Sequence, residues 1–375
     1  MPAILEPLME EGAPPFAAPP CPPMQATDRP RRLLIVSDAW RPQVNGVVHT
    51  YDMIARELRQ RGHTVRVIGP DEFSSVPMPG YGEIPLALAP GRRMSALIDG
   101  YDPQAVHIAV EGPLGWAARR HCLRRGLAFS TAFHTNFPAY AALRAPRPMA
   151  RRVADGAVAL ARRFHAPARH TYVATASLEA QLRDWGFGGR LVRLSRGVDC
   201  TLFHPGPRRP PQRPAVLLYV GRVAPEKNIA AFLNLSTAQT GPARKVVVGD
   251  GPLLAALQRR HPDVEFTGTL RGAALAQAYR DADAFVFPSR TDTFGIVLIE
   301  AMASGLPIAA HDVPGPRDIV TDPMLGAIDN DLGRAVRRAL RAPGDPAARH
   351  AHARDRFSWT AVASAFATHS AELQR

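Results

Sequence analysis

The sequence predicts an α/β protein made of two doubly wound domains that face each other across a cleft. Its 375 residues exceed one ordinary hydrophobic core and suit two domains of roughly 150 to 180 residues. Short apolar runs alternate with helical patterns in both halves, which is the βαβ rhythm of parallel sheets covered on both faces. Residues 201–214, rich in proline and arginine, are typical of an interdomain linker, and the alternative is a surface loop within one domain.

The first half divides into a leader and a domain at residues 31–200. Residues 1–30 lack a basic start and an apolar core and are broken by prolines, so we expect a disordered leader and no signal peptide. A strand at 32–37 leads through a polar loop into a helix from Gly46 to about Gln60. Further apolar runs predict strands at 64–69, 105–110, 128–133, 171–174 and 191–194.

The second domain, residues 215–356, repeats the pattern. Strands are predicted at 215–220, 245–249, 264–267, 284–287 and 307–310, with helices between them. A last helix is expected from Trp359 to about Leu373. Neither domain carries the Gly-x-Gly-x-x-Gly fingerprint after its first strand, which disfavours a dinucleotide-dependent oxidoreductase, and there is no Walker lysine motif.

Composition narrows the class of protein further. The formal net charge is +13 and is carried almost wholly by arginine, since Lys227 and Lys245 are the only lysines. Such a charge favours anionic partners, but no nucleic-acid-binding motif is present, so no nucleic-acid partner is expected. Three scattered cysteines without metal-ligand spacing indicate a reducing compartment, and no run approaches a membrane span. We therefore expect a cytoplasmic protein.

The most informative segment is 281–307, which predicts a buried strand, a polar turn and a helix from about Gly295 to Ser304. Asp292 lies just before that helix and Glu300 lies two turns inside it. Open N–H groups at a helix start bind anions, and carboxylates accept hydrogen bonds from hydroxyls. This combination suits a ligand with phosphate and many hydroxyls, such as a nucleotide sugar.

Two other strand-to-helix loops carry candidate ligand-binding residues. One supplies positive charge, and the other lets a ligand approach the backbone. Arg222 and Lys227 follow the first strand of the second domain, where two cations can clamp a diphosphate and neutralise the charge on a leaving nucleotide. A lysine retained in an arginine-rich chain indicates a need for a compact ammonium group. In the first domain, Gly46 allows a ligand to approach the backbone at a helix start, although a plain N-cap at Asn45 explains the same residues.

Together these motifs resemble the donor-binding signature of the GT4 family of retaining glycosyltransferases, which have the two-domain GT-B architecture. The matching residues are the Asp292/Glu300 pair with its Ala-Met-Ala-Ser-Gly-Leu-Pro tail, the Gly221-Arg222…Lys227 clamp, and the Asn45-Gly46-Val47 loop. Many members have Glu where this chain has Asp292. The resemblance covers about residues 31–375 and implies that the last helix, within 357–375, packs back onto the first domain.

The resemblance also implies roles for individual residues. Catalytic roles fall to His134, Arg222, Lys227 and Asp292. Asp38 and Glu111 are expected on the acceptor side. Donor contacts are expected from Asn45, Gly46, Val47, Gly221, Gly249, Gly251, Leu270, Thr293, Phe294, Gly295, Ile296, Val297 and Glu300. No metal or other cofactor is expected, because the two cations neutralise the diphosphate and Asp281-Ala282-Asp283 lies at a helix end before a buried strand.

Several alternatives remain open at this point. The expected reaction moves a hexose to a lipid or glycan hydroxyl, with GDP-mannose favoured as donor over UDP-glucose or UDP-sulfoquinovose. Other classes are a non-catalytic GT-B relative and a basic protein that binds nucleic acid or membrane. A basic amphipathic helix at 149–164, with Val153, Ala157, Leu160 and Phe164 on one face, either packs on the core or docks on an anionic membrane, which would make the protein peripheral to it.

Overall fold

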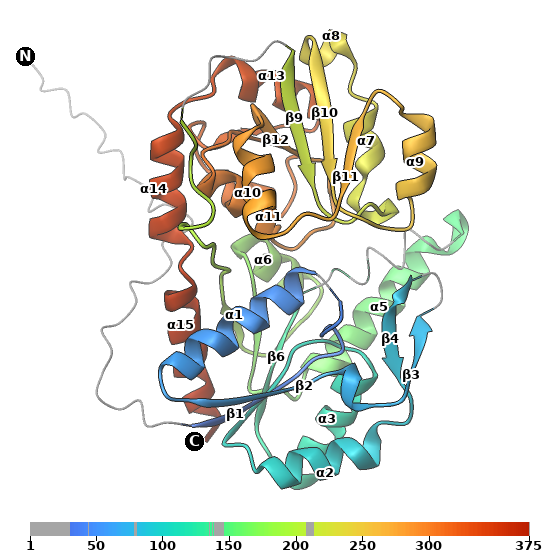
Figure 1. The fold of residues 1–375 in the computed structure, drawn as a ribbon. Coiled ribbons are helices and arrows are strands. Elements are labelled where there is room, and N and C mark those ends of the chain that lie inside the picture. Colours follow the sequence, from blue (N-terminus) through green and yellow to red (C-terminus); the bar gives the residue numbers. More distant parts are fainter. Residues whose placement is uncertain are drawn as a thin grey trace, which may run out of the picture.

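The computed structural model describes residues 31–43, 45–78, 81–134, 136, 138, 146–207 and 214–374. The predicted leader and residues 208–213 of the predicted linker lie outside this part. The described chain contains two six-stranded parallel sheets, one in each half, with helices on both faces (Figure 1). The predicted α/β class with two doubly wound domains is confirmed.

The sheet of the first domain has the strand order β2-β1-β5-β6-β7-β8. Its strands are β1 (Arg32–Val36), β2 (Thr64–Ile68), β5 (Ala105–Ile108), β6 (Phe129–Ala132), β7 (His170–Val173) and β8 (Leu191–Arg193). Its helices are α1 (Gly46–Gln60), α2 (Gly91–Tyr101), α3 (Pro113–Arg125), α5 (Ala150–His165) and α6 (Ala176–Asp184). A separate antiparallel hairpin, β3 (Ser75–Met78) with β4 (Tyr81–Ala87), was not predicted.

The sheet of the second domain has the order β11-β10-β9-β12-β13-β14. Its strands are β9 (Ala215–Val220), β10 (Ala243–Val248), β11 (Glu265–Gly268), β12 (Ala284–Phe287), β13 (Ile308–Ala310) and β14 (Gly326–Ile328). Its helices are α7 (Ile229–Leu233), α8 (Thr237–Thr240), α9 (Leu254–Arg260), α10 (Gly272–Arg280), α11 (Ile296–Ala303), α12 (Pro316–Ile319), α13 (Leu332–Arg341) and α14 (Pro346–Arg356). The sequence did not predict β14, because it has only three residues and opens on a glycine.

Helix α1 shows how these elements follow from the residues. Asn45 caps its start, and its buried side chains recur three or four positions apart, among them Tyr51, Ile54 and Leu58. The last helix, α15 (Trp359–Ala371), packs against α1 (Figure 1). Phe366 of α15 belongs to the same hydrophobic core cluster as Tyr51. Helix α15 therefore packs on the first domain, although it follows the second domain in the sequence.

Strand order marks where a ligand site belongs. In each sheet the chain reverses its direction of growth, between β1 and β5 in the first domain and between β9 and β12 in the second. Ligands of doubly wound sheets bind at such switch points, beyond the carboxyl ends of the strands. His134 follows β6 and contacts Thr293, which follows β12. The carboxyl edges of the two sheets thus meet at the waist of the molecule.

Helix α5 buries only part of its predicted apolar face. Phe164 is buried, as are Ala161 and His165, but the Leu160 side chain is 55% exposed. The helix packs by its last turn and projects from the domain body at its start (Figure 1). Among the described residues, no helix combines the length and the hydropathy required to cross a bilayer.

Candidate active site

The loops after β9 and β12 lie side by side at the switch point of the second domain. The first ends in a 3₁₀ turn, η3 (Pro225–Lys227), and Lys227 Nζ forms an ion pair with Asp292 Oδ1. Asn228 Nδ2 donates a hydrogen bond to the carbonyl of Pro288 at 3.0 Å. Thr291 Oγ1 donates to the carbonyl of Glu226 at 3.2 Å. These bonds fix the predicted cation and the predicted carboxylate in one place.

The second carboxylate oxygen of Asp292 is not the one that pairs with Lys227. This Oδ2 is buried and has no hydrogen-bond partner among the described residues. A buried carboxylate oxygen without a donor is costly, so it requires an explanation, and a bound ligand is one. The arrangement suits a ligand that brings hydroxyl groups to Asp292.

Arg222 and the nearby glycines lie in the loops after β9 and β10, next to the Lys227–Asp292 pair. The carbonyl of Arg222 accepts a hydrogen bond from the Tyr219 hydroxyl at 2.7 Å, and partial burial lowers the pKa of its guanidinium. Gly249 has φ +140°, and a Cβ built there would lie 1.9 Å from the carbonyl oxygen of Gly221. The loops after β9 and β10 therefore touch backbone to backbone, which explains Gly249 without a ligand.

The start of α11 presents open amide groups to the same space. Gly295 adopts φ +89° at the N-cap and aims the helix out of the loop. Among the described residues, no acceptor is found for the backbone N–H groups of Phe294, Gly295, Ile296 and Val297. Four unsatisfied N–H groups at a helix start are a site for a phosphate or another anion.

Glu300 occupies the second turn of α11. Its Oε2 accepts a hydrogen bond from the Tyr279 hydroxyl at 2.9 Å, and burial raises the pKa of Glu300 to about 7. Tyr279 comes from α10 and is fully buried. No sequence pattern pointed to this tyrosine, because its partner lies on another helix.

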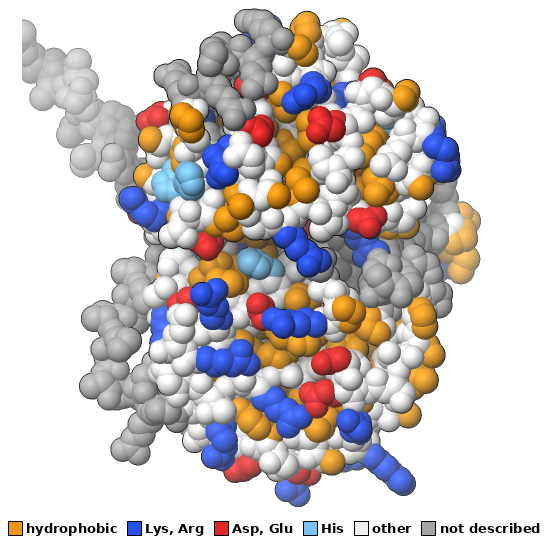
Figure 2. Space-filling view, viewed as in Figure 1, with side chains coloured by type: hydrophobic (Ala, Val, Ile, Leu, Met, Phe, Trp, Pro, Cys, Tyr) orange, Lys and Arg blue, Asp and Glu red, His pale blue; other side chains and the backbone are white. Residues whose placement is uncertain are grey.

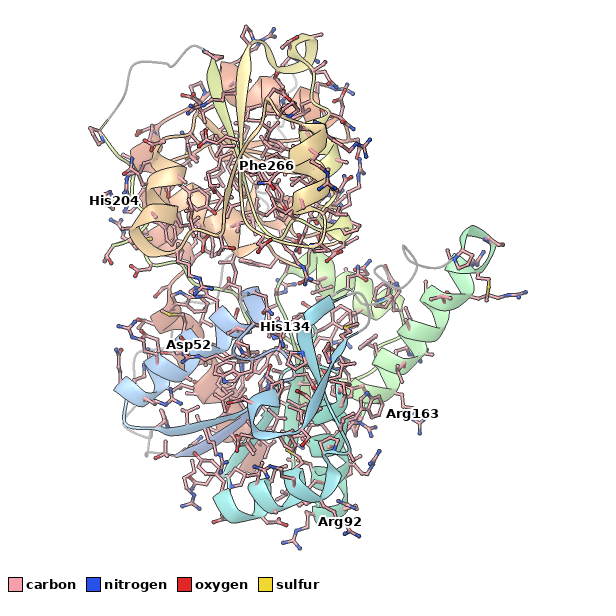
Figure 3. The ribbon with its side chains drawn as sticks, turned by 45° about the vertical axis from the view of Figure 1, so that its right-hand side comes forward. Asp52, Arg92, His134, Arg163, His204 and Phe266 are labelled. Atoms are coloured by element: carbon pink, nitrogen blue, oxygen red, sulfur yellow. The ribbon has the colours of Figure 1, made fainter. Side chains whose placement is uncertain are left out.

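His134 stands on the opposite wall, at the waist between the domains (Figure 3). Its Nδ1 is 2.9 Å from an Arg196 nitrogen, and its Nε2 is 2.6 Å from the Tyr51 hydroxyl. Arginine only donates, so Nδ1 accepts and the single ring proton is on Nε2. Burial and the Arg196 charge lower the pKa of His134 well below its usual value. A sugar contact through either nitrogen would require one of these bonds to break.

A chain of hydrogen bonds continues behind His134. The Tyr51 hydroxyl also lies 2.6 Å from His107 Nε2, and His107 Nδ1 lies 2.9 Å from the Ser130 hydroxyl. On the side of the second domain, the carbonyl of His134 accepts a hydrogen bond from Thr293 Oγ1 at 2.6 Å. His134 thus connects the interior of the first domain to the donor-side loop of the second.

The start of α1 faces the start of α11. Asn45 Oδ1 accepts hydrogen bonds from the backbone N–H groups of Val47 and Val48, both at 3.0 Å, so Asn45 is the helix N-cap. A Cβ built on Gly46 would lie 3.5 Å from Ile296 Cδ1. The two predicted glycine-bearing helix starts therefore oppose each other across the cleft. Leu270, by contrast, packs against the core of the second domain.

The two residues expected on the acceptor side are engaged within the first domain. Asp38 Oδ1 accepts from Leu114 N at 2.9 Å, and Oδ2 accepts from Gly115 N at 3.0 Å, so this carboxylate caps α3. Burial raises the pKa of Asp38 to about 6. Glu111 Oε1 lies 3.0 Å from His165 Nε2. Both oxygens of Asp38 thus cap α3, and its place on the acceptor side stays a prediction.

Arg196 is a cleft residue that the sequence did not reveal. It is 5% exposed and donates to the carbonyls of Leu194 and Ser195. Its guanidinium lies 5.9 Å from the centre of the Phe294 ring, and no carboxylate of the described chain is within ion-pair distance of it. Burial lowers the pKa of Arg196 to about 10. With so many arginines in the chain, nothing in the sequence distinguishes this one.

The Asp281-Ala282-Asp283 segment makes structural contacts. Asp283 Oδ2 accepts a hydrogen bond from the backbone of Val216 at 2.7 Å, and Asp281 Oδ1 accepts from the Gln277 amide at 2.8 Å. Within the described ranges, no group of three His, Cys, Asp or Glu side chains could hold a metal ion.

Comparison with known proteins agrees with this geometry. Residues 44–202 match the family described as Glycosyltransferase Family 4, and residues 214–348 match the one described as Glycosyl transferases group 1. A GDP-mannose-dependent alpha-mannosyltransferase of Mycobacterium tuberculosis is 34% identical over 323 residues, which cover 79% of this chain and 83% of that protein. A sulfoquinovosyl transferase of Arabidopsis thaliana is 29% identical, covering 80% of this chain and 64% of that protein.

Solved structures show the same architecture. Sucrose-phosphate synthase from Thermosynechococcus elongatus aligns with a TM-score of 0.72 at 20% identity, over 92% of this chain and 99% of that one. An Anabaena protein solved with UDP and glucose aligns with a TM-score of 0.66 at 15% identity, over 90% of this chain and 99% of that one. The fold is GT-B, and the enzyme class inferred from the motifs is confirmed. The chain is a glycosyltransferase and belongs to glycosyltransferase family 4.

Proposed function

We propose that the protein transfers a hexose from a nucleotide-diphosphate donor to a hydroxyl of a lipid or glycan, with retention of the anomeric configuration. The observation that carries this proposal is the Lys227–Asp292 pair, whose second carboxylate oxygen is buried without a donor beside the open amides of α11. Cation, carboxylate and helix start together match a ligand that carries both phosphate and hydroxyl groups.

The pair itself suggests how the donor is received. In the free protein Lys227 is held by Asp292. A diphosphate competes for the ammonium group, and its binding frees Asp292 to accept hydrogen bonds from sugar hydroxyls. Glu300, fixed by Tyr279, then accepts from the ribose hydroxyls. Donor binding thus replaces an internal ion pair by two contacts to the ligand.

Departure of the nucleotide is the step that these groups promote. Negative charge develops on the leaving diphosphate, and preorganised donors aimed at that charge lower the barrier. Arg222, Lys227 and the amides of residues 294–297 supply such donors. We assign this neutralisation to these groups and not to a metal ion, so a chelator is expected to leave the rate unchanged. The acceptor oxygen bonds to the anomeric carbon on the face from which the diphosphate departs, and its proton passes to the departing phosphate oxygen. Attack on this face gives retention.

The relatives favour one donor. Three relatives named GDP-mannose-dependent alpha-mannosyltransferase are 34%, 33% and 28% identical, and the sulfoquinovosyl transferase is 29% identical. GDP-mannose is therefore the proposed donor, with UDP-glucose or UDP-sulfoquinovose as the alternative. A relative at 26% identity is named for a phosphatidylinositol monomannoside, which supports a lipid among the acceptors.

A thermal-shift panel of GDP, UDP and ADP with their sugars tests the donor site. GDP-mannose is expected to raise the melting temperature most, and Lys227→Ala and Glu300→Ala are expected to abolish that rise. Arg244→Ala, a change of an exposed cation on β10, is the matched control and should respond like the wild type. The donor-site assignment fails if no nucleotide stabilises the wild type, or if Lys227→Ala and Glu300→Ala respond as the wild type does.

We also propose that the enzyme acts in the cytoplasm, against an anionic membrane surface. Support comes from the exposed face of α3 and α5, where a groove of about 320 Å³ is lined by Trp116, Arg119, Arg120, Leu123, Arg124 and Arg163. Leu123, Met149 and Leu160 are each about half exposed on the same two helices or next to them. Basic side chains with exposed apolar neighbours favour the headgroup region of such membranes.

Vesicle flotation separates membrane binding from general basicity. The wild type is expected to float with phosphatidylglycerol vesicles and to remain behind with phosphatidylcholine vesicles. Arg120→Glu with Arg124→Glu should abolish flotation, whereas the same change at Arg259 and Arg260 on α9 should not. Equal flotation of both double variants, or retention on heparin with no flotation, would contradict the membrane proposal.

A further inference from the structure

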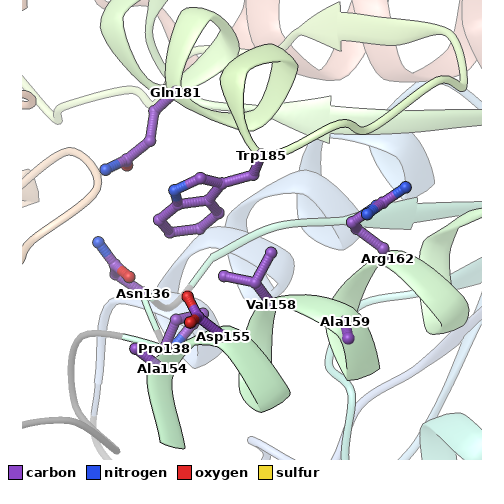
Figure 4. A pocket seen from close by; sticks show the side chains of 9 residues that line it. All are labelled: Asn136, Pro138, Ala154, Asp155, Val158, Ala159, Arg162, Gln181 and Trp185. Atoms are coloured by element: carbon purple, nitrogen blue, oxygen red, sulfur yellow. The ribbon is translucent and has the colours of Figure 1, made fainter. Parts of the chain in front are cut away.

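A second cavity lies in the first domain. Its volume is about 470 Å³, in the range of small-molecule sites (Figure 4). It lies between α5, α6 and the chain that follows β6. Its lining residues are Asn136, Pro138, Ala154, Asp155, Val158, Ala159, Arg162, Gln181 and Trp185.

The cavity is lined by one aromatic side chain, Trp185, and by several planar polar side chains. The indole of Trp185 extends across the cavity toward Asp155 and Val158 of α5 (Figure 4). Two side-chain amides, Asn136 and Gln181, and the Asp155 carboxylate offer donors and acceptors around it. Aromatic faces pack on the C–H surface of a sugar ring while amides and carboxylates bind its hydroxyls.

Packing fixes the orientation of Trp185. Its backbone N–H donates to the carbonyl of Gln181 at 3.0 Å in the last turn of α6. Its ring meets the buried Phe133 edge to face, with centroids 6.2 Å apart. An indole held on one side by protein and open on the other to a cavity is a preorganised platform, so little entropy is lost when a ring stacks on it.

The cavity is connected to the donor wall at two points. Asn136 comes two residues after His134, whose carbonyl accepts from Thr293 of the second domain. At the other end of α6, the Ser177 N–H donates at 3.0 Å to Asp318 Oδ1, a buried carboxylate of α12. Both the loop and the helix that line the cavity therefore touch the donor-binding domain.

We propose that this cavity binds a pyranose ring of the acceptor, stacked on Trp185 and held by hydrogen bonds to Asp155, Asn136 and Gln181. The inference rests on the proposed function, because it names the acceptor of the same transfer. It assigns the head group to a carbohydrate ring, whether that ring belongs to a glycolipid or to a free glycan. Arg162, at the edge of the cavity, adds a contact for an anionic substituent.

Direct binding tests the cavity without the donor. Saturation-transfer difference NMR with the methyl pyranosides of glucose, mannose, galactose, N-acetylglucosamine and glucuronic acid should give a signal with at least one of them. Trp185→Ala should remove this signal, and Trp185→Phe, which keeps the contact with Phe133, should weaken binding by about threefold to tenfold. Asp155→Asn should weaken binding, and Asp184→Asn, its matched control at the end of α6, should not.

Transfer to the octyl glycoside of the same sugar gives a second readout. Trp185→Phe should raise the KM for the glycoside and leave the KM for the donor and its thermal shift within about twofold. The inference is overturned if no pyranoside gives a signal with the wild type, or if Trp185→Ala keeps the wild-type signal in a folded protein. A wild type that binds a pyranoside but no nucleotide sugar would instead contradict the proposed function.

Discussion

The two walls of the cleft use their polar side chains in opposite ways. On the wall of the second domain, Asp292 keeps a buried oxygen without a donor, and the first amides of α11 have no acceptor in the described chain. On the wall of the first domain, Tyr51 and His134 bond to each other and to their neighbours. Basic side chains edge the hollow between the two walls (Figure 2).

This difference indicates which wall receives a ligand first. Unsatisfied buried groups destabilise the free protein and are relieved when a ligand binds, whereas satisfied networks hold a shape. Changes on the wall of the second domain should therefore appear mainly as lost donor binding or turnover. Changes on the wall of the first domain should appear mainly as lost stability. Substitutions at five residues test this comparison.

The largest effect is expected from Lys227→Met. This change keeps the length of the side chain but removes the charge that would neutralise the leaving diphosphate. We expect turnover to fall about 10²- to 10³-fold, as for loss of one preorganised charge-stabilising donor. Stability should fall by about 1–3 kcal/mol, because Asp292 loses its partner. Steady-state kinetics and urea unfolding measure the two losses.

Lys227→Arg is the control for that substitution. It keeps the charge but replaces a compact ammonium by a planar fork, so it should recover stability more than turnover. The comparison between the walls would be wrong if Lys227→Met lost only stability and transferred sugar at the wild-type rate.

The second-largest effect is expected in the pH dependence of nucleotide affinity, which Glu300 controls. Burial raises the pKa of Glu300 from 4.5 to about 7, and the carboxylate form is the one that accepts from ribose hydroxyls. Nucleotide affinity should therefore rise through about pH 7, by roughly fivefold between one unit below this pKa and the pKa itself. Tyr279→Phe removes a hydrogen bond that lowers this pKa, so the midpoint should move upward. Calorimetric titration across this pH range measures both, and Glu300→Gln should show a flat, weaker profile.

The free energy of unfolding of the ligand-free protein should fall as pH rises, whereas nucleotide affinity should increase. The pKa of Glu300 is higher in the folded than in the unfolded protein, so its contribution to stability is full below about pH 4.5 and is lost as pH rises through about 7. Asp38, whose pKa is raised from 3.8 to about 6 by burial, acts in the same direction. Glu300→Gln should remove part of this slope. An unchanged slope would contradict the raised pKa of Glu300.

The sequence predicted the wall of the second domain better than that of the first for a physical reason. Lys227, Asp292 and Glu300 belong to contiguous strand–loop–helix units, and the spacing of such a unit already determines its geometry. Tyr279 and Arg196 act through contacts between distant elements, so no local pattern reveals them. The strands β9 and β12 were predicted with their observed bounds because burial on both faces gives continuous apolar runs.

On the wall of the first domain, Tyr51→Phe should cost stability. The hydroxyl bridges His134 and His107, and its removal leaves a buried ring nitrogen on each side without a partner. We expect the free energy of unfolding to fall by about 1–3 kcal/mol, with the donor KM within about twofold of the wild type. A loss of turnover without a loss of stability would show that His134 and Tyr51 act in the reaction, as the sequence prediction for His134 states.

The smallest effect is expected where the two walls touch. Thr293→Val removes the hydroxyl that donates to the His134 carbonyl at 2.6 Å but keeps the shape of the side chain. The bond is neutral and joins two domains, so its loss should cost about 0.5–1.5 kcal/mol of domain closure. Donor KM should rise about twofold to tenfold, with little change in unfolding. Thr293→Ser retains the hydroxyl and should restore the KM. If Thr293→Ser raises the KM and Thr293→Val does not, the contact between the walls comes from the Thr293 methyl group and not from its hydrogen bond.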